Sequence, residues 1–289
     1  MSKLSKTSRS DELTGGRRPL LLALCAAALA MAAPAPVFAE DAAVTGDTGD
    51  GLDLDKMKMT FADEFDDLSV SAWGPGTRWI AHTPWSGDFG GARFANPKDG
   101  FPFTVDDGVL RIESSKDGKG EWRSGLLASV DPKGNGFAQQ YGYFETRAQL
   151  PTGPGLWPAF WLIGKDRSKS TAEIDVMEYY GDKPDGYSST VHVWYRNGDH
   201  YSKFSRINAF LKNKPGDFHT YGVKIDEKYI RMYFDRQMVW KTETRPEHQQ
   251  PMYVLLNLGL VDNVTKASAP DPSHMYVDYV HVYALPQQP

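Results

Sequence analysis

Short apolar segments alternate with clusters of Gly, Pro, Asn and Asp along most of the chain. Runs such as GVLRIESS, YGYFETRAQL, STVHVWY and MYVDYVHVYAL are rich in aromatic and β-branched residues, which favour strands. Stretches such as DPKGNG, PTGPG and KPDG separate them and are typical of turns, whereas no segment carries a long helical period. This pattern predicts an all-β fold, either a sandwich or a jelly roll.

The N-terminal segment differs from this pattern. A polar, basic stretch leads into the apolar run LLALCAAALAMAA and then PAPVFA, which predicts a secretory signal peptide over residues 1–39. The apolar run is shorter than the ~20 residues that a membrane-spanning helix needs. Residues 40–57 are acidic and poor in large apolar side chains, so we predict a flexible lead-in. One folded domain over 58–285 and a short tail over 286–289 follow.

The signal peptide predicts a secreted or periplasmic protein. Arg17 and Arg18 are also compatible with twin-arginine export. The single cysteine, Cys25, lies within the signal peptide, so the mature chain has no disulfide or thiol chemistry. Leu24 stands before Cys25 where lipid attachment would call for a small residue, so we expect no stable membrane anchor.

Net charge narrows the range of partners. Without residues 1–39 the chain has 27 basic and 35 acidic residues, a net charge of −8. This charge argues against nucleic acid or an anionic membrane surface as a partner. Neutral polymers, small molecules and proteins stay open.

Three acids, Glu173, Asp175 and Glu178, occur together in the stretch EIDVMEYYG. On a regular strand the first two share a face, and the third points to the opposite face because its offset is odd. A β-bulge with one extra residue, at Val176 or Met177, would return Glu178 to the face of the other two. The intervening apolar side chains would then point into the core.

Acids gathered on one face raise one another's pKa, which is costly unless a function requires it. Retaining glycoside hydrolysis is such a function, since it uses a carboxylate nucleophile and a protonated carboxylic acid roughly 5–5.5 Å apart. Asp175, between the two glutamates, would help to keep one of them protonated. Two other interpretations fit the spacing: an acidic edge strand without a catalytic role, and a calcium site.

The sequence EIDVME resembles the E-x-D-x-x-E signature of glycoside hydrolase family 16, in the bulged form typical of laminarinases. FADEF, DDGVLRIE, GLWPAFWLIG and STVHVWY also follow the order usual in that family, so the resemblance extends over 60–283. It implies a concanavalin A-like jelly-roll sandwich of two antiparallel sheets with a concave active-site cleft. By the family pattern Glu173 would be the nucleophile, Asp175 its assisting acid and Glu178 the general acid/base.

Aromatic side chains near these acids are candidates for substrate binding, because sugar rings stack on aromatic faces. Trp157 and Trp161 are four residues apart and therefore share a strand face, although core packing would explain them equally well. Pro158 between them favours an edge or rim position. In STVHVWY, His192 and Trp194 also share a face, and the resemblance places such a His near the acid/base glutamate.

Three polar residues are further substrate-binding candidates. Glu121 and Arg123 match an E-x-R-S stretch that faces sugar in lichenases, with a surface salt pair as the alternative. Asn257 lies in the apolar strand LLNLG and must therefore find a hydrogen-bonding partner. The family pattern places an Asn here in the cleft.

A long stretch rich in aromatic residues and glycine follows the first predicted strand. It contains Trp79, His82, Trp85, Asp88, Phe89, Arg93 and Asn96. Exposed aromatic residues in a loop mark binding, so we expect this stretch to shape the donor side of the cleft, with Trp85 in contact with substrate. The stretch does not match typical laminarinases, which leaves the glycan open.

The resemblance also implies a structural calcium ion on the convex side of the sandwich. Its ligands would be Glu64, the main-chain oxygen of Gly108, and Asp278, all hard oxygen donors. A site that holds no ion is the alternative. There is no His or Cys cluster for zinc, and we expect no cofactor for catalysis.

These observations predict a secreted, monomeric, endo-acting and retaining glycoside hydrolase with a polysaccharide substrate. Its target would be the internal β-glucosidic bonds of a β-1,3- or mixed β-1,3/1,4-glucan, or of a related bacterial exopolysaccharide. The alternatives are a transglycosylase with the same residues and a non-catalytic glucan-binding module, although such modules typically lack one catalytic glutamate. A sulfated galactan would call for extra Arg and Lys in the cleft, which the net negative charge does not favour.

Overall fold

The computed structural model describes residues 51–85, 87–262 and 268–286. The predicted signal peptide and most of the lead-in lie outside these residues. Within them the chain is nearly all strand, and the helices are three single turns of 3₁₀ helix: η1 (Leu54–Lys56), η2 (Ala209–Leu211) and η3 (Pro246–His248). None of the described helices is long and apolar enough to cross a membrane. The predicted all-β class is confirmed.

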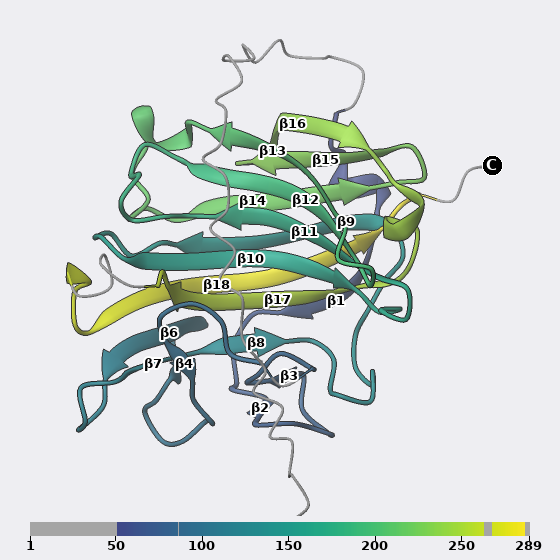
Figure 1. The fold of residues 1–289 in the computed structure, drawn as a ribbon. Helices are drawn as coiled ribbons and strands as arrows, with labels where there is room; N and C mark the ends of the chain where they lie inside the picture. The colour runs from purple at the N-terminus through teal and green to yellow at the C-terminus, as the bar shows by residue number, and fades with distance from the viewer. Residues whose placement is uncertain (1–50, 86, 263–267, 287–289) are drawn as a thin grey trace, which may run out of the picture. The chain divides into compact units, whose positions relative to one another are not determined.

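The strands form two sheets, which Figure 1 shows as a layered array. The ten-stranded sheet has the order β16 (Gln237–Glu243), β15 (Tyr229–Phe234), β14 (His219–Ile225), β9 (Gly142–Gln149), β18 (Ser273–Ala284), β6 (Val109–Lys116), β7 (Trp122–Ser124) and β4 (Arg93–Phe94). Two further strands pair with it, β1 (Lys58–Asp63) on β18 and β5 (Phe103–Asp106) on β6.

The second sheet carries the three acids. Its order is β13 (His200–Ile207), β12 (Tyr187–Tyr195), β11 (Ser170–Glu178), β10 (Leu156–Gly164), β17 (Met252–Leu260), β8 (Leu126–Ala128), β3 (Trp79–Ile80) and β2 (Val70–Ser71). The pairs β2–β3 and β4–β7 are parallel, whereas all other neighbouring strands in the described part of the chain are antiparallel. The predicted jelly-roll sandwich is confirmed, with these two short parallel pairs as a difference from purely antiparallel sheets.

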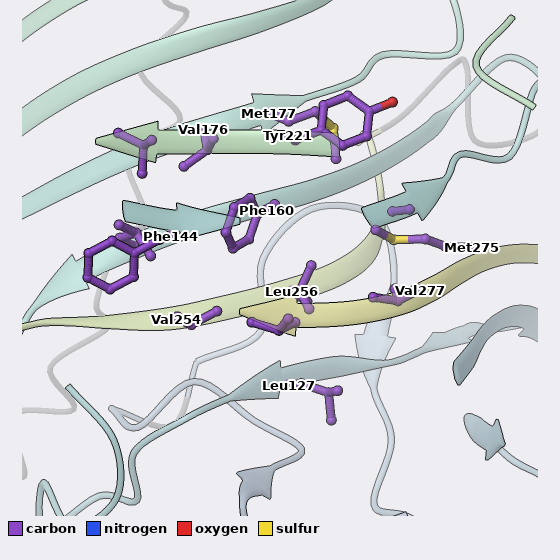
Figure 2. Close-up of a cluster of buried hydrophobic side chains, with 14 of the residues drawn as sticks. Leu127, Phe144, Phe160, Val176, Met177, Tyr221, Val254, Leu256, Met275 and Val277 are labelled. Atoms are coloured by element: carbon purple, nitrogen blue, oxygen red, sulfur yellow. The ribbon is translucent and has the colours of Figure 1, made fainter. Parts of the chain in front are cut away.

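The main hydrophobic core draws on inward-facing side chains of both sheets. Figure 2 shows Val176 and Met177 of β11 and Phe160 of β10 in the same cluster as Phe144 of β9 and Val277 of β18. All five side chains are almost completely buried. Full burial of a side chain of this size contributes about 1.5–3 kcal/mol, so the core fixes which face of β11 points outward.

The described end of the predicted lead-in differs from a flexible chain. Leu52, Leu54 and Met57 pack against a cluster of buried tyrosines that includes Tyr143 and Tyr233. Residues 51–57 therefore belong to the packed structure, because their few apolar side chains find a hydrophobic partner.

The aromatic stretch after β1 is not a continuous loop, since it contributes β2, β3 and β4. Trp79 of β3 is only 1% exposed, and its indole Nε1 donates a hydrogen bond of 2.6 Å to Asp63. The prediction that this stretch shapes the cleft is therefore wrong for Trp79. The alternation of β3 sends its side chain into the core instead.

Candidate active site

A bulge interrupts β11 at the position that the spacing of the three acids predicts. Between Asp175 and Glu178 the register with β12 shifts, so that Val176 and Met177 together oppose a single residue, Ser189. The register with β10 shifts at the same place. The Ser189 hydroxyl donates to the carbonyl oxygen of Val176 at 2.7 Å, which ties the bulge to β12. The predicted bulge is confirmed.

As a result, Glu173, Asp175 and Glu178 all line one cavity of about 260 Å³, called here the acid cavity. The other lining residues are Trp85, Gly87, Asp88, Phe89, Trp157, Ala159, Trp161 and Asn257. Ile174, between the first two acids, lies in the core. The side chains of β11 thus divide between cavity and core as the bulge requires.

Two donors bond the same oxygen of Glu178. Trp157 Nε1 donates to Glu178 Oε1 at 3.1 Å, and the Tyr180 hydroxyl donates to it at 3.0 Å. The rings of Trp157 and Tyr180 stack with centroids 5.6 Å apart, which holds both donors in place. The other oxygen, Oε2, accepts no hydrogen bond from the described residues. A proton on Oε2 would therefore be free to move to a substrate.

Glu173 and Asp175 are bound from the neighbouring strand β12. Trp194 Nε1 donates to Glu173 Oε2 at 2.7 Å, and His192 Nε2 lies 3.1 Å from Asp175 Oδ2. The rings of His192 and Trp194 stack with centroids 5.2 Å apart. The prediction that these two side chains share a face is confirmed, and each contacts one of the acids.

His200 of β13 extends this arrangement, and the sequence pattern did not point to it. Its Nε2 lies 2.9 Å from His192 Nδ1, and its ring stacks on Trp194 with centroids 3.6 Å apart. Asp175, His192 and His200 thus form a hydrogen-bonded chain that leads outward from the acid cavity. The contact depends on the pairing of Trp194 with His200 across β12 and β13, which spacing along the chain does not reveal.

Burial raises the pKa of all three acids. It is the main reason that the pKa of Glu173 rises to about 8, with the charge of Asp175 adding to the effect. Burial, together with the charge of Glu178, holds the pKa of Asp175 well above its usual range. The pKa of Glu178 is raised by burial although the hydrogen bond from Tyr180 opposes this. Burial also lowers the pKa of His192, which therefore carries less positive charge beside the acids. With their own pKa values raised, the acids retain protons that exposed carboxylates would release.

The predicted tryptophan pair lies on β10, directly beside the acids. Trp157 and Trp161 both line the acid cavity, which confirms that they share a face. Of the predicted edge or rim position, the edge is wrong, because β10 lies between β11 and β17. Pro158 is tolerated because it stands near the start of β10, where its carbonyl oxygen still accepts the main-chain N–H of Tyr179.

Asn257 meets the predicted need for a partner. Its Oδ1 accepts a hydrogen bond of 2.8 Å from Trp161 Nε1, and its Nδ2 donates to the main-chain oxygen of Trp157 at 3.4 Å. Asn257 is fully buried below the acid cavity. It therefore links β17 to both tryptophans of β10.

The aromatic stretch closes one side of the acid cavity through Trp85 and Phe89. Trp85 meets Trp161 edge-on at 6.3 Å, and Phe89 meets Trp157 edge-on at 5.6 Å. The chain approaches closely at Gly90, where a Cβ would lie 2.3 Å from the carbonyl oxygen of Leu260. Glycine is required there for the aromatic residues to reach the cavity.

Other members of the aromatic stretch lie away from the acids. His82 bonds the Asn96 side chain at 2.8 Å and stacks on Trp73, whereas Arg93 pairs with Asp88 at 3.7 Å. Of these residues Asp88 lines the acid cavity. The described stretch thus reaches the cavity through Trp85 and the segment 87–89.

Glu121 and Arg123 do not line the acid cavity. Arg123 Nε and Nη2 each lie 2.9 Å from Asp117 Oδ2, and the main-chain N–H of Glu121 donates to Asp117 Oδ1. Asp117 organises the hairpin between β6 and β7, so the alternative of a salt pair between Glu121 and Arg123 is wrong. The structure does not bring these two predicted substrate residues to the acids.

The three predicted calcium ligands are only partly brought together. A Cβ on Gly108 would lie 3.5 Å from the main-chain oxygen of Glu64, so these two positions are close. The Glu64 carboxylate is bonded to His281 at 2.6 Å, however, and the Asp278 carboxylate to Arg147 at 2.5 Å. Among the described residues no group of three His, Cys, Asp or Glu side chains is arranged to hold a metal ion. The residues as placed do not form the implied ligand set, so binding of calcium would require the carboxylates of Glu64 and Asp278 to leave His281 and Arg147.

Comparisons with known proteins complete the description of the site. The sequence model of the protein family described as glycosyl hydrolases family 16 matches residues 100–281 of the chain. The chain is 32% identical over 257 residues to the endo-1,3-1,4-beta-glycanase ExsH of Rhizobium meliloti (strain 1021), an alignment that covers 81% of this chain and 53% of that protein. It is 29% identical over 267 residues to glucan endo-1,3-beta-glucosidase A1 of Niallia circulans, covering 78% of this chain and 38% of that protein.

The chain therefore spans about half the length of the first of these relatives and less of the second. Among solved structures, SCLam, described as a non-specific endo-beta-1,3(4)-glucanase from family GH16, matches with a TM-score of 0.66 at 27% sequence identity. That match covers 79% of this chain and 91% of the SCLam chain.

Proposed function

The chain belongs to the glycosyl hydrolases of family 16, and from this premise we propose that it is an endo-acting, retaining β-glucanase. The observation that carries the proposal is the bulge in β11, which places the buried Asp175 and the half-buried Glu173 and Glu178 on one face beside aromatic walls. In this bulged strand the apolar residues on one face pack in the core, whereas the three acids on the other face do not contribute to core packing. Their raised pKa values suit proton transfer at a glycosidic bond.

In this mechanism Glu178 is the general acid. Its Oε1 accepts the bonds from Trp157 and Tyr180, so the proton sits on Oε2 and passes to the glycosidic oxygen as the bond to the leaving sugar breaks. The resulting carboxylate then takes a proton from the water that attacks the intermediate. The donors on Oε1 favour that carboxylate, which lowers the cost of the first proton transfer.

Glu173 is the nucleophile, and it attacks the anomeric carbon to form a covalent glycosyl-enzyme. The bond from Trp194 Nε1 to Glu173 Oε2 fixes the carboxylate and leaves Oε1 for the attack. Asp175 lies between the two glutamates on the strand, and its hydrogen bond with Glu173 raises the pKa of that glutamate. In the proposal Asp175 takes up the shared proton when Glu173 becomes the nucleophile.

The proposed substrate is a β-1,3- or mixed β-1,3/1,4-glucan, or a bacterial exopolysaccharide with such linkages. The activities for which the relatives from Rhizobium meliloti and Niallia circulans are named support this class of bond. The apolar faces of Trp85, Trp157 and Phe89 around the acids suit sugar rings. We also propose that residues 1–39 direct secretion of the enzyme.

Hydrolysis of defined polysaccharides tests the proposal. Reducing ends released from laminarin, lichenan, barley glucan, agarose and carrageenan would be measured for the purified protein and its Glu173→Ala variant. We expect activity on at least one β-glucan, loss of that activity in the variant, and retention at the anomeric carbon in the first product seen by NMR. Binding without turnover would favour the glucan-binding module, and transfer products without reducing ends would favour a transglycosylase.

A further inference from the structure

A second cavity of about 260 Å³ opens beside the acid cavity, and its lining is rich in positive charge. Lys133, Lys165 and Arg167 contribute to this basic cavity, together with Tyr253 and one carboxylate, that of Asp131. We propose that the basic cavity binds an anionic substituent, such as a carboxylate, on the glycan whose backbone lies along the acid cavity. The proposal rests on the function proposed above and makes its substrate more specific.

The two cavities meet at Arg167 and Trp85. The guanidinium carbon of Arg167 lies 4.0 Å from the centroid of the Trp85 ring, and Trp85 lines the acid cavity. In the sheet, Ile163 of β10 pairs with Glu173 on one side and with Tyr253 on the other. The basic cavity therefore lies at the Glu173 end of the row of acids, within reach of a substituent on a bound sugar.

The cations of the basic cavity form no ion pair within the described part of the chain. Lys133 and Lys165 are exposed, and Arg167 Nε donates a hydrogen bond of 3.3 Å to the neutral Thr171 hydroxyl. The Asp131 carboxylate offsets one of these charges, and its oxygens already accept hydrogen bonds, Oδ1 from the main-chain N–H groups of Lys133 and Asn135 and Oδ2 from the Asn135 amide. The lining of the basic cavity thus carries three positive charges against one negative charge.

This arrangement matches an anionic group better than a neutral sugar. Stacking on Trp85 orients the guanidinium of Arg167, whose planar set of donors is suited to a carboxylate. The whole chain carries a formal charge of −5, so a local excess of positive charge is not a consequence of composition. The net charge argued against an anionic glycan, but only the local charge beside the acids bears on binding.

A matched pair of substrates tests the proposal by kinetics. Barley glucan substituted with carboxymethyl groups would be compared with the same glucan substituted to the same degree with neutral hydroxyethyl groups. We expect the protein to prefer the carboxymethyl glucan in kcat/KM, and the variant Lys133→Gln/Lys165→Gln to lose about tenfold on it while its activity on hydroxyethyl glucan is unchanged. Added salt should reduce the preference of the unaltered protein, since the contact is electrostatic.

The control variant Lys58→Gln/Lys228→Gln removes the same charge from exposed positions on the ten-stranded sheet and its turns. It should keep the preference for carboxymethyl glucan. Equal activity of the unaltered protein on both glucans, or a preference that survives in Lys133→Gln/Lys165→Gln, would overturn the proposal.

Binding measurements separate failure of this inference from failure of the proposed function. Calorimetric titration of the Glu173→Gln protein with each substituted glucan needs no turnover. If neither glucan is hydrolysed, the proposed β-glucanase function fails, whereas tighter binding of carboxymethyl glucan that depends on Lys133 and Lys165 would still support the basic cavity. Hydrolysis of both glucans without any charge-dependent binding would retain the function and overturn the inference.

Discussion

The three acids are chemically alike, but each has different hydrogen-bonding neighbours. These neighbours give each acid a different tendency to hold a proton. Glu178 receives an indole and a phenol on one oxygen, Glu173 receives one indole, and Asp175 meets an imidazole. Because Asp175 is buried and both glutamates are half-buried, differences in hydrogen bonding influence which acid holds a proton. The division of roles in the proposed mechanism is a consequence of these contacts.

Removal of the Tyr180 hydroxyl should change the pH dependence of activity. The bond from Tyr180 lowers the pKa of Glu178, so Tyr180→Phe should raise that pKa. A general acid works only while protonated, so the alkaline limb of the kcat/KM profile should move to higher pH, with a rate loss below about tenfold at the optimum. Tyr229→Phe, on the other sheet, serves as the control and should leave the profile in place.

Burial of Glu173 should also make the stability of the protein depend on pH. Its pKa rises from 4.5 to about 8 on folding, so the folded state binds the extra proton between these values and loses stability as pH rises through them. Glu173→Gln removes the titrating group. We expect the variant to have a higher Tm than the unaltered protein at pH 8.5, and the difference to shrink towards pH 4. An equal Tm difference at all pH values would contradict the raised pKa.

At the scale of the strand, the bulge in β11 sets which side of the sheet Glu178 faces. Deletion of Met177 alone would make the offset between Glu173 and Glu178 even, so a regular strand would still present both in the acid cavity. Deletion of both Val176 and Met177 would turn Glu178 towards the core. The bulge thus directs Glu178 into the acid cavity, which a regular strand with the same number of residues would not do.

These two deletions give opposite predictions. The deletion of Met177 should retain measurable hydrolysis despite a cost of about 2–5 kcal/mol for the lost core side chain. The double deletion should abolish hydrolysis. Near-UV circular dichroism and reducing-end assays would be recorded for both, and a folded but inactive Met177 deletion would show that the bulge itself positions Glu178.

Strands β10 and β17 are coupled through the bond between Trp161 and Asn257. Asn257→Leu leaves Trp161 Nε1 buried without an acceptor and should cost about 1–3 kcal/mol in the free energy of unfolding. Trp161→Phe removes the donor, so the double variant should be more stable than the sum of the single losses predicts. Urea denaturation of the four proteins measures this coupling, and additive losses would mean that the bond is of no consequence.

At the scale of the whole sandwich, the carboxylates predicted to bind calcium lie on or next to the ten-stranded sheet, whereas the three acids lie on the other sheet. Because the Glu64 and Asp278 carboxylates are occupied by His281 and Arg147, we expect neither EDTA nor added calcium to change Tm. Thermal unfolding under both conditions measures this. A rise in Tm with calcium that disappears in Asp278→Asn would instead establish the ion and show that these pairs open to bind it.

The sequence by itself determined the all-β class and the bulge, because these depend on side-chain alternation along single strands, and it indicated the family through the resemblance of EIDVME and the motifs around it. The odd offset of Glu178 and the apolar residues beside it were sufficient to predict which face each side chain takes. Tyr180 could have been found in the same way, since it follows Glu178 by two residues on the same face.

Only the tertiary structure decided which strands lie side by side, because register between strands depends on packing across the whole sheet. It brought His200 to His192 and the indole of Trp194 to Glu173, and it placed β10 in the interior of its sheet. It also brought Lys133, from the connection between β8 and β9, into one cavity with Lys165 and Arg167, from the connection between β10 and β11. Spacing along a strand specifies the direction of a side chain, whereas its partners are set by the packing of segments far apart in the chain.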